Sequence, residues 1–389
     1  MRGHEPGMRL SRTERSVLSE WWFTVDRVLL AAILAIIAAG LLLSLAASPA
    51  IAIKRGLPTY YFSERHLVFA LLSASLLLAV SLSSPATVRR LALAVLVVAA
   101  ALMLLVALGG VEIKGARRWL LLGGYSLQPS EFAKPAFVVL SAWLLAESER
   151  RPDMPAAMLA TIIYLLFATL LLVEPDVGQT LLVSLLAAVL FLLAGRPLRF
   201  LALAATVPAV LLFARAHSAY VRLRLDHYLH PESGEGFQTD RALQSFVEGG
   251  LFGKGPGEGT IKSVLPDAHT DFIFAVTAEE YGVFACLLLV ALFALIAGRV
   301  LSRQLDRPDA FSRLASVGLT LLITLQAMFN IAVNVGLLPA KGITLPFISS
   351  GGSSMLATGL GAGMLLALTR RRPDPARVKK PGFSASLSV

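Results

Sequence analysis

The twenty residues from Leu91 to Gly110 carry no charged side chain, and similar runs recur along the chain. A helix of about twenty apolar residues is long enough to cross the hydrocarbon of a bilayer. Only 15% of the residues are charged and the mean hydropathy is +0.72, whereas soluble chains carry about a quarter charged residues. We therefore expect an all-α integral membrane protein of about ten transmembrane helices. The predicted spans are 28–48, 66–83, 91–110, 130–146, 156–173, 178–194, 199–216, 272–297, 314–336 and 352–369.

The Lys and Arg residues between these spans predict the orientation of the chain. If the N-terminus is cytoplasmic, the cytoplasmic segments contain 21 of them and the outer segments 12, of which five lie in one long loop. Long loops cross largely regardless of charge, so the asymmetry favours cytoplasmic termini. The net charge of +10 is then mainly topological, and nucleic-acid binding is not expected. The predicted regions are a cytoplasmic N-terminal tail (1–27), a membrane domain (28–369) with a long outer loop (217–271), and a cytoplasmic C-terminal tail (370–389).

The N-terminal region contains no cleavable signal peptide by pattern. Mostly polar residues with five arginines precede the first apolar run, and that run is long enough to stay in the bilayer. We therefore interpret it as a retained signal anchor.

The long outer loop ends in the segment Leu265–Phe274, where the eighth predicted helix begins. Asp271 in this segment has two interpretations. Either Asp271 or Thr270 caps the helix, where a side-chain oxygen accepts backbone N–H bonds. Alternatively, a carboxylate at the mouth of a membrane cavity, beside an apolar wall, can take a proton from a substrate hydroxyl. His269 could add a second titrating group, although a lone histidine more often only forms hydrogen bonds.

Two further carboxylates, Glu279 and Glu280, follow Asp271 within the same predicted helix. At about 100° per residue, Glu279 lies within roughly 80° of the direction of Asp271, and Glu280 lies on the opposite face. A carboxylate inside the bilayer is costly unless it faces a cavity or a partner. The alternative is that the bilayer-spanning part starts later, near Gly282, which would leave both carboxylates at the interface.

Cations gather on the outer face, against the general charge asymmetry. Arg117 and Arg118 stand beside Trp119. A guanidinium matches the oxygens of phosphate, which favours a diphosphate or another anionic headgroup, with anchoring to lipid headgroups as the alternative. In the fourth predicted helix, Glu131 and Lys134 are spaced i, i+3 and predict an ion pair, which at a membrane edge is most often structural.

The turn between the fifth and sixth predicted helices contains Glu174 and Asp176, for which helix capping is the alternative to a site. The glycine-rich segment 249–259 follows no strand and lacks the Lys-Ser/Thr of a nucleotide P-loop, so that kind of site is excluded.

The last two predicted helices carry amides and glycines. Gln326, Asn330 and Asn334 line the ninth predicted helix, the asparagines at i, i+4, and such buried amides are expected to bond neighbouring helices. Gly359 and Gly363 form a GxxxG pattern, which is a common helix-packing motif and one candidate docking face for a partner.

Taken in their order along the chain, these segments resemble the SEDS family, whose members polymerise peptidoglycan glycan strands from lipid II. The resemblance covers nearly all of the predicted membrane domain, and the Lys-Gly-Ile-Thr-Leu-Pro sequence is closer to the cell-division branch than to the elongation branch. One departure is Ser350, where many relatives have tyrosine. The residues that carry the resemblance are Gly115, Ala116, Arg118, Trp119, Gln128 to Lys134, Pro175, Asp176, Leu265 to Phe274 and Lys341 to Ser354.

This resemblance implies an inverting glycosyltransferase, because an α-linked diphosphate donor becomes a β-1,4 glycan. Asp271 would deprotonate the GlcNAc 4-hydroxyl. Arg117, Arg118, Lys134 or a divalent cation (Mg²⁺ or Mn²⁺) would neutralise the departing undecaprenyl diphosphate, and the lipid tails would lie in grooves between helices. The candidate substrate-binding residues are Arg117, Arg118, Trp119, Glu131, Lys134, Asp176, His269, Glu279, Lys341 and Ser353.

The resemblance also implies a location and partners. The protein would lie in the bacterial inner membrane at the division septum, with 217–271 in the periplasm. The chain has no serine-transpeptidase motif, so a single-span class B penicillin-binding protein would crosslink the strands, alongside other divisome proteins. Two rival functions remain open, a transporter that flips lipid II and a non-catalytic scaffold.

Overall fold

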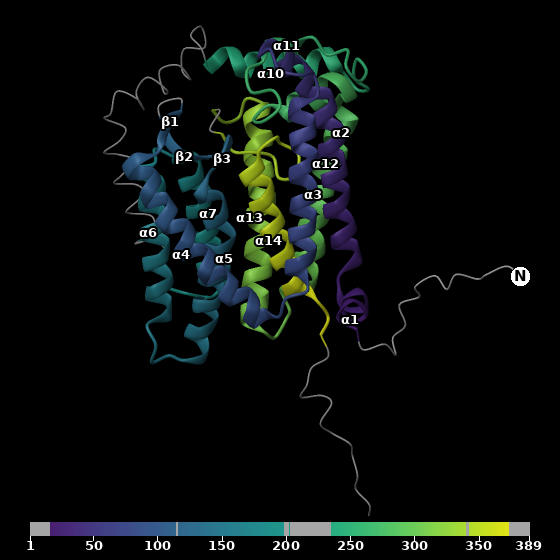
Figure 1. The fold of residues 1–389 in the computed structure, drawn as a ribbon. Helices are drawn as coiled ribbons and strands as arrows, with labels where there is room; N and C mark the ends of the chain where they lie inside the picture. The colour runs from purple at the N-terminus through teal and green to yellow at the C-terminus, as the bar shows by residue number, and fades with distance from the viewer. Residues whose placement is uncertain (1–15, 114–115, 198–201, 203–234, 340–341, 373–389) are drawn as a thin grey trace, which may run out of the picture.

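The computed structural model describes residues 16–113, 116–197, 202, 235–339 and 342–372. Long helices run side by side through the molecule, with α1 at one end and β1–β3, α10 and α11 at the other (Figure 1). We call these the terminal end and the sheet end. The helices are α1 (Val17–Thr24), α2 (Arg27–Lys54), α3 (Tyr61–Ser81), α4 (Pro85–Gly109), α5 (Pro129–Arg150), α6 (Ala156–Val173), α7 (Val177–Leu193), α10 (Glu235–Gly249), α11 (Ile261–Val264), α12 (Ile273–Gln304), α13 (Ala310–Asn334) and α14 (Gly352–Thr369).

The predicted spans can be compared with these helices. Nine of the ten coincide with a helix in the described part of the chain, and the seventh, 199–216, lies outside the described residues apart from residue 202. Seven helices (α2, α3, α4, α6, α12, α13 and α14) are long and apolar enough to cross a membrane, and α7 is a shorter apolar helix. The all-α membrane class is confirmed, and the total of ten spans stays a prediction.

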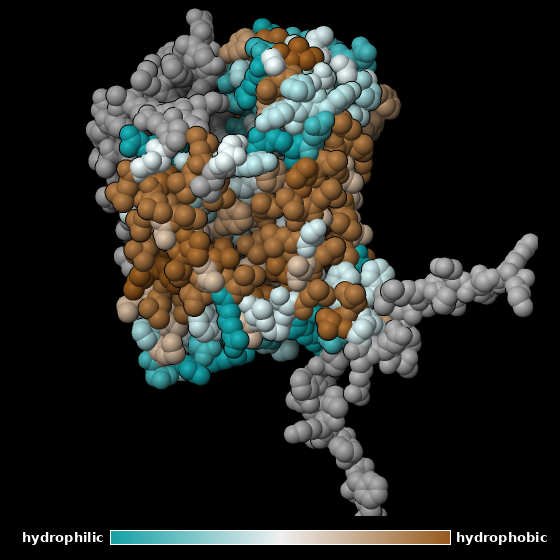
Figure 2. Space-filling view, in the orientation of Figure 1, coloured by the Kyte–Doolittle hydropathy of each residue, from teal (hydrophilic) through white to brown (hydrophobic). Residues whose placement is uncertain are grey.

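An apolar band covers the middle of the face seen in Figure 2, with hydrophilic residues toward both ends. Burial differs between helices: the most apolar window of α14 is 83% buried inside the protein, whereas that of α4 is only 22% buried. The half of α5 nearest the sheet end, including Glu131 and Lys134, is also buried. In α14 and in this half of α5, the polar side chains therefore face other helices.

The GxxxG pattern lies inside the bundle. A Cβ atom on Gly359 would lie 2.3 Å from Ser73 Oγ, and one on Gly363 would lie 2.8 Å from the carbonyl oxygen of Leu77. Both glycines therefore pack α14 closely against α3. The interpretation as a packing motif is confirmed, and the interpretation as a partner-docking face is wrong, because α3 already covers that face.

A small antiparallel sheet, absent from the sequence-based prediction, follows α4. Its strands are β1 (Val111–Ile113), β2 (Ala116–Leu122) and β3 (Tyr125–Leu127), in the order β1-β2-β3. Leu122 pairs with Tyr125, so Gly123 and Gly124 form a two-residue turn, and both have positive φ (56° and 83°) as such turns require. The sheet holds β2, with its arginines, over the sheet end of the bundle (Figure 1).

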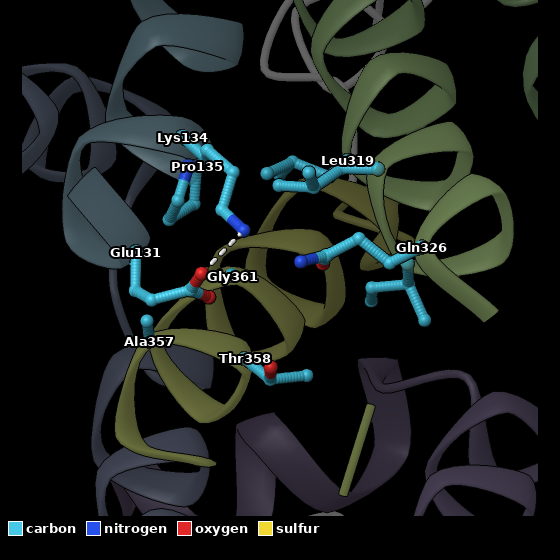
Figure 3. A pocket seen from close by; sticks show the side chains of 10 residues that line it. Glu131, Lys134, Pro135, Leu319, Gln326, Ala357, Thr358 and Gly361 are labelled. Carbon is cyan, nitrogen blue, oxygen red and sulfur yellow. Dashed lines mark hydrogen bonds and ion pairs between the residues drawn. The ribbon is translucent and has the colours of Figure 1, made fainter. Parts of the chain in front are cut away.

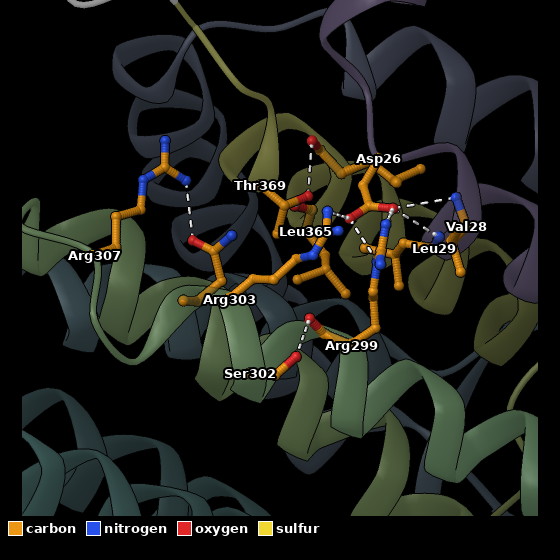
Figure 4. A network of polar contacts seen from close by, with 11 residues as sticks. Asp26, Val28, Leu29, Arg299, Ser302, Arg303, Arg307, Leu365 and Thr369 are labelled. Carbon is orange, nitrogen blue, oxygen red and sulfur yellow. Dashed lines mark hydrogen bonds and ion pairs between the residues drawn. The ribbon is translucent and has the colours of Figure 1, made fainter.

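Both described ends of the chain meet at the terminal end. Asp26 accepts hydrogen bonds from Arg299 Nε (3.0 Å) and Arg303 Nη1 (2.9 Å), which ties the start of α2 to the last turns of α12 (Figure 4). Arg370 Nε donates to Thr24 Oγ1 at 2.9 Å, so the end of α14 contacts α1. The two described ends therefore lie on the same side of the bundle.

Candidate functional site

Asp271 lies in a tight turn at the sheet end, just before α12. The carbonyl oxygen of Asp267 accepts backbone N–H bonds from Thr270, Asp271 and Phe272 at 3.0, 3.1 and 3.3 Å. Asp267 has a φ of +54°, a left-handed conformation that aspartate adopts more readily than most residues. Phe272 and Phe274 are buried, whereas Asp271 is partly exposed. The turn thus anchors its aromatic residues in the core and leaves Asp271 accessible.

Two asparagines of α13 fix the backbone of this turn. The Nδ2 atoms of Asn330 and Asn334 each donate to the carbonyl oxygen of Asp271 at 2.9 Å. Asn334 Oδ1 accepts the amide of Ala275, in the first turn of α12, at 3.0 Å. α12 begins at Ile273 after Phe272, which provides no side-chain cap. The backbone N–H of Ala275 is instead satisfied by Asn334, on α13. The alternative in which Asp271 or Thr270 caps the helix is therefore wrong, and the expectation for the asparagines is confirmed.

The segment before α14 packs against the same turn. Ser350 N donates to the carbonyl oxygen of His269 at 2.9 Å, and Ser349 Oγ donates to that of Thr270 at 2.5 Å. A Cβ atom on Gly342 would lie 4.0 Å from Asp271 Oδ2, so this backbone runs beside the carboxylate. The His269 ring is buried against Phe62, with the ring centroids 4.8 Å apart. Lys341, a predicted site residue, lies outside the described residues.

A second polar group lies buried under the sheet. Lys134 Nζ is 2.8 Å from Glu131 Oε1 and donates to Gln179 Oε1 at 2.9 Å, while Gln179 Nε2 donates to Glu131 Oε1 at 3.0 Å. The predicted i, i+3 ion pair is thus confirmed. Its charges are paired and hydrogen-bonded, as buried charges within a membrane protein must be.

This ion pair faces a small cavity between α5, α13 and α14. Gln326 of α13 points toward the pair from the opposite wall (Figure 3). The cavity is lined by Glu131, Lys134, Pro135, Leu319, Leu322, Ile323, Gln326, Ala357, Thr358 and Gly361.

Arg118 connects β2 to the turn between α6 and α7. Its Nε atom donates to the carbonyl oxygen of Glu174 at 3.1 Å, its Nη2 atom donates to that of Pro175, and its Nη1 atom lies 3.3 Å from Asp176 Oδ2. Asp176 Oδ1 also accepts the amide of Gln179 at 3.2 Å, so the capping interpretation of Asp176 is confirmed. One guanidinium and one carboxylate thus hold the turn in place.

The two acids of this turn have unusual proton affinities. Burial raises the pKa of Asp176, against the opposing effect of the Arg118 guanidinium. Burial, together with the nearby Asp176, raises the pKa of Glu174 to about 8. Both oxygens of the Glu174 side chain are buried without a hydrogen-bond partner in the described part of the chain. Glu174 is therefore a neutral acid at neutral pH.

Glu279 and Glu280 anchor a loop. Glu279 accepts the backbone amides of Thr260, Ile261 and Lys262 at 2.6, 2.8 and 3.1 Å, and Glu280 forms an ion pair with the Lys262 side chain. These contacts hold the 257–262 loop against α12. They give Glu279 a structural role, and its predicted contact with substrate stays a prediction.

The helical backbone of α12 breaks at Gly282, which has a φ of +78°. A Cβ atom there would lie 2.3 Å from the carbonyl oxygen of Leu251, so only glycine fits. This break lies at the position where the sequence offered an alternative start of the span.

The remaining predicted residues lie around these groups. Arg117 is exposed, Trp119 is partly buried, and Ser353 Oγ accepts the amide of Gln128 at 3.3 Å. Arg118 and Asp176 connect through Gln179 to Glu131 and Lys134, and we call these five residues the α5–α7 cluster. Asp271 and His269 belong to a separate turn next to α13.

One helix contacts both groups. Gln326, Asn330 and Asn334 recur every four residues on α13, and the interval from the first to the last is about 12 Å along the helix axis. The first faces the cavity beside the α5–α7 cluster, and the other two hold the Asp271 turn. The repeated amides in an apolar helix were the sequence signal for this connection. No comparable signal identified Gln179 or Lys262, whose partners lie far away in the sequence.

The described residues offer no set of ligands for the divalent cation that the sequence resemblance implies. Within the described ranges, no three His, Cys, Asp or Glu side chains converge in a way that could hold a metal ion. Asp176, Glu131 and Glu280 instead form ion pairs with arginine or lysine, and Glu279 accepts backbone amides.

Comparisons with known proteins agree on one group of relatives. The model of the family of cell cycle proteins FtsW/RodA/SpoVE matches residues 26–373. The chain is 43% identical over 370 residues to the probable peptidoglycan glycosyltransferase FtsW of Caulobacter vibrioides (strain NA1000 / CB15N), covering 93% of this chain and 94% of that protein. It is 37% identical over 350 residues to the protein of the same name from Coxiella burnetii (strain RSA 493 / Nine Mile phase I), covering 86% and 93%.

Solved structures give the same result. A chain from a peptidoglycan synthase complex, described as coordinating polymerization and crosslinking, superimposes with a TM-score of 0.72 at 27% identity, covering 90% of this chain and 98% of that one. The rod shape determining protein RodA of Thermus thermophilus superimposes with a TM-score of 0.66 at 27% identity, covering 90% and 99%.

Proposed function

The chain belongs to the FtsW/RodA/SpoVE family of cell cycle proteins, and on this premise we propose that it is the septal peptidoglycan glycosyltransferase, a multi-pass membrane enzyme that polymerises lipid II into β-1,4 glycan strands. The observation that carries the proposal is the Asp271 turn. The carboxylate of Asp271 is partly exposed. The backbone of its turn is held in place by the side-chain amides of Asn330 and Asn334 and by the 342–351 segment. Rigid positioning of this kind is what a general base needs.

The chemistry is an inverting displacement. Asp271 accepts the proton of the acceptor 4-hydroxyl while that oxygen attacks the anomeric carbon of the donor, and the bond from this carbon to the diphosphate oxygen breaks. Arg118 and Lys134 stabilise the negative charge of the departing undecaprenyl diphosphate. Arg118 suits this role because its contacts with the 174–176 turn use three of its five N–H groups in the described part of the chain.

An apolar groove accommodates the polyprenyl tail. It lies between α4 and α5 and reaches the end of β3. This strand pairs with β2, the strand that carries Arg118. A hydrocarbon chain in this groove would keep its diphosphate end near the sheet end of the bundle. The groove is lined by Ala94, Val95, Val98, Ala99, Leu102, Leu127, Pro129 and Phe132.

The sheet end faces the periplasm, and both termini lie in the cytoplasm, as the charge asymmetry indicates. Two exposed serines offer a matched test, since Cys286 is the single native cysteine and is buried. We expect Ser263→Cys, in α11, to react with an impermeant thiol reagent in intact spheroplasts. Ser302→Cys, at the terminal end of α12, should react only after lysis. The opposite labelling pattern would invert the topology.

A single-span class B penicillin-binding protein is the partner that crosslinks the strands. The similarity to a chain of a peptidoglycan synthase complex supports this pairing, as does the lack of a serine-transpeptidase motif in the sequence. We expect the purified full-length chain to convert fluorescent lipid II into a polymer that lysozyme digests, and to do so at least about tenfold faster with the partner bound.

Three results would contradict the proposed polymerase activity or the proposed transpeptidase partner. Full activity of the chain alone, with no transpeptidase recovered by co-purification, would remove the partner. Movement of lipid II across a liposome bilayer without polymer would indicate a transporter. An inactive chain that still recruits an active transpeptidase would indicate a scaffold.

A further inference from the structure

Glu174 is the one buried acid of the 174–176 turn that the proposed mechanism does not use. Only 1% of the residue is exposed, and neither side-chain oxygen has a hydrogen-bond partner in the described part of the chain. An ionised carboxylate in such a place is very costly, whereas a neutral carboxylic acid is tolerated. The backbone carbonyl of the same residue accepts a bond from Arg118, and the Arg118 guanidinium also acts electrostatically on the acid, so the acid is close enough to sense the proposed diphosphate-binding side chain.

The charges around Glu174 are already balanced. Arg118, from β2, is paired with Asp176 in the same turn, and Lys134 is paired with Glu131 on α5. Asp176 and Arg118 are the charged groups that act on Glu174, and Glu131 and Lys134 act on Asp176. A negative charge on Glu174 would be the fifth and unbalanced charge, next to the guanidinium that receives the substrate.

We propose that Glu174 is a positioning residue for Arg118: as a neutral acid it leaves the guanidinium available to a diphosphate, and as a carboxylate it competes for that guanidinium and repels the diphosphate. This inference rests on the proposed function, since it takes the substrate diphosphate as the ligand of Arg118. It adds a proton-controlled condition for substrate binding. A diphosphate diester carries two negative charges throughout the neutral range, so it cannot itself supply that condition.

The pH dependence follows from the proton affinity of Glu174. Because the pKa is about 8, the acid is neutral at pH 7 and ionised at pH 9.5. We expect the dissociation constant of fluorescent lipid II for the purified full-length protein to rise about tenfold across this interval. Glu174→Gln retains the neutral form at every pH, so it should keep the pH 7 affinity at pH 9.5. In a polymerisation assay the same effect should appear mainly in KM, since it acts on binding rather than on Asp271.

Glu149→Gln is a matched control, because Glu149 is an exposed glutamate at the other end of α5. This variant should follow the wild-type pH profile. An affinity that does not change with pH in the wild type, or an identical profile in Glu174→Gln, would overturn the inference. A pH-dependent affinity in a protein that makes no polymer would contradict the proposed function and leave this inference standing. Lack of lipid II binding at every pH contradicts both.

Thermal unfolding provides a measurement that does not depend on substrate. An acid with a raised pKa binds its proton more tightly in the folded state, so stability falls as pH rises from the usual pKa of 4.5 to about 8, and no further above it. We expect the wild type and Glu149→Gln to show this decline alike. Glu174→Gln should lack the part of the decline that comes from ionisation of Glu174. If all three proteins lose melting temperature in parallel, Glu174 is ionised in the folded state and the inference fails.

Discussion

Asp271→Asn should abolish polymerisation, with a fall of about 100-fold or more, while the protein still folds and inserts. A neutral amide cannot accept the proton of the acceptor hydroxyl, and removal of a general base typically costs 10²–10⁴-fold. Folding should survive because the turn is held through the backbone of Asp271, by Asn330 and Asn334, and not through its side chain acting as a cap. Polymer formation from lipid II with the partner present, and the melting temperature in detergent, are the two measurements.

Two further variants sharpen this prediction. Asp271→Glu retains the carboxylate but moves it by one methylene, so it should recover little activity if position matters. Asp267→Asn is the matched control in the same turn, because asparagine also tolerates the positive φ of that position, and we expect its activity to stay within about threefold of wild type. Wild-type polymerisation by Asp271→Asn would dismiss Asp271 as the base and direct attention to Asp176.

Arg118→Lys is expected to have the second-largest effect, a loss of about ten- to 100-fold in kcat/KM. Lysine keeps a positive charge near Asp176, but it cannot bond two carbonyl oxygens and a carboxylate while also presenting N–H groups to a diphosphate. The 174–176 turn and the phosphate contact should weaken together. The measurement is steady-state polymerisation with lipid II titrated, supported by the melting temperature.

Arg117→Lys provides the comparison on the same strand. Arg117 is exposed and precedes Arg118, so their side chains point to opposite faces of β2. We expect less than about a threefold loss for Arg117→Lys. Equal losses in the two variants would mean that positive charge on the strand, and not the fixed guanidinium, provides the contribution.

The sequence predicted best what depends on length and hydropathy. Runs such as 91–110 have one stable solution in a bilayer, so α4 and most other long helices lie where they were expected. The small sheet was missed because its strands are short and lie within the 19-residue segment between two predicted spans, although Gly123–Gly124 is a hairpin signal.

At the site, local spacing was informative and long-range pairing was not. The Glu131–Lys134 pair follows from i, i+3 geometry on one helix. The Arg118–Asp176 contact joins residues far apart in the sequence, and no periodicity encodes it. The expected direction of Glu279 assumed a regular helix and an open cavity, but a loop supplies three backbone amides to that carboxylate.

The amides of α13 have a mechanical consequence. The carbonyl oxygen of Asp271 accepts hydrogen bonds from Asn330 and Asn334. Gln326, on the same helix, lines the cavity beside Lys134. We therefore expect a displacement of α13 to move Asp271, the proposed base, and to change its distance from the α5–α7 cluster at the same time. The rest of α13 runs from these residues toward the terminal end (Figure 1), so a partner that displaced this helix there would change the distance between the proposed base and the α5–α7 cluster without contacting either substrate.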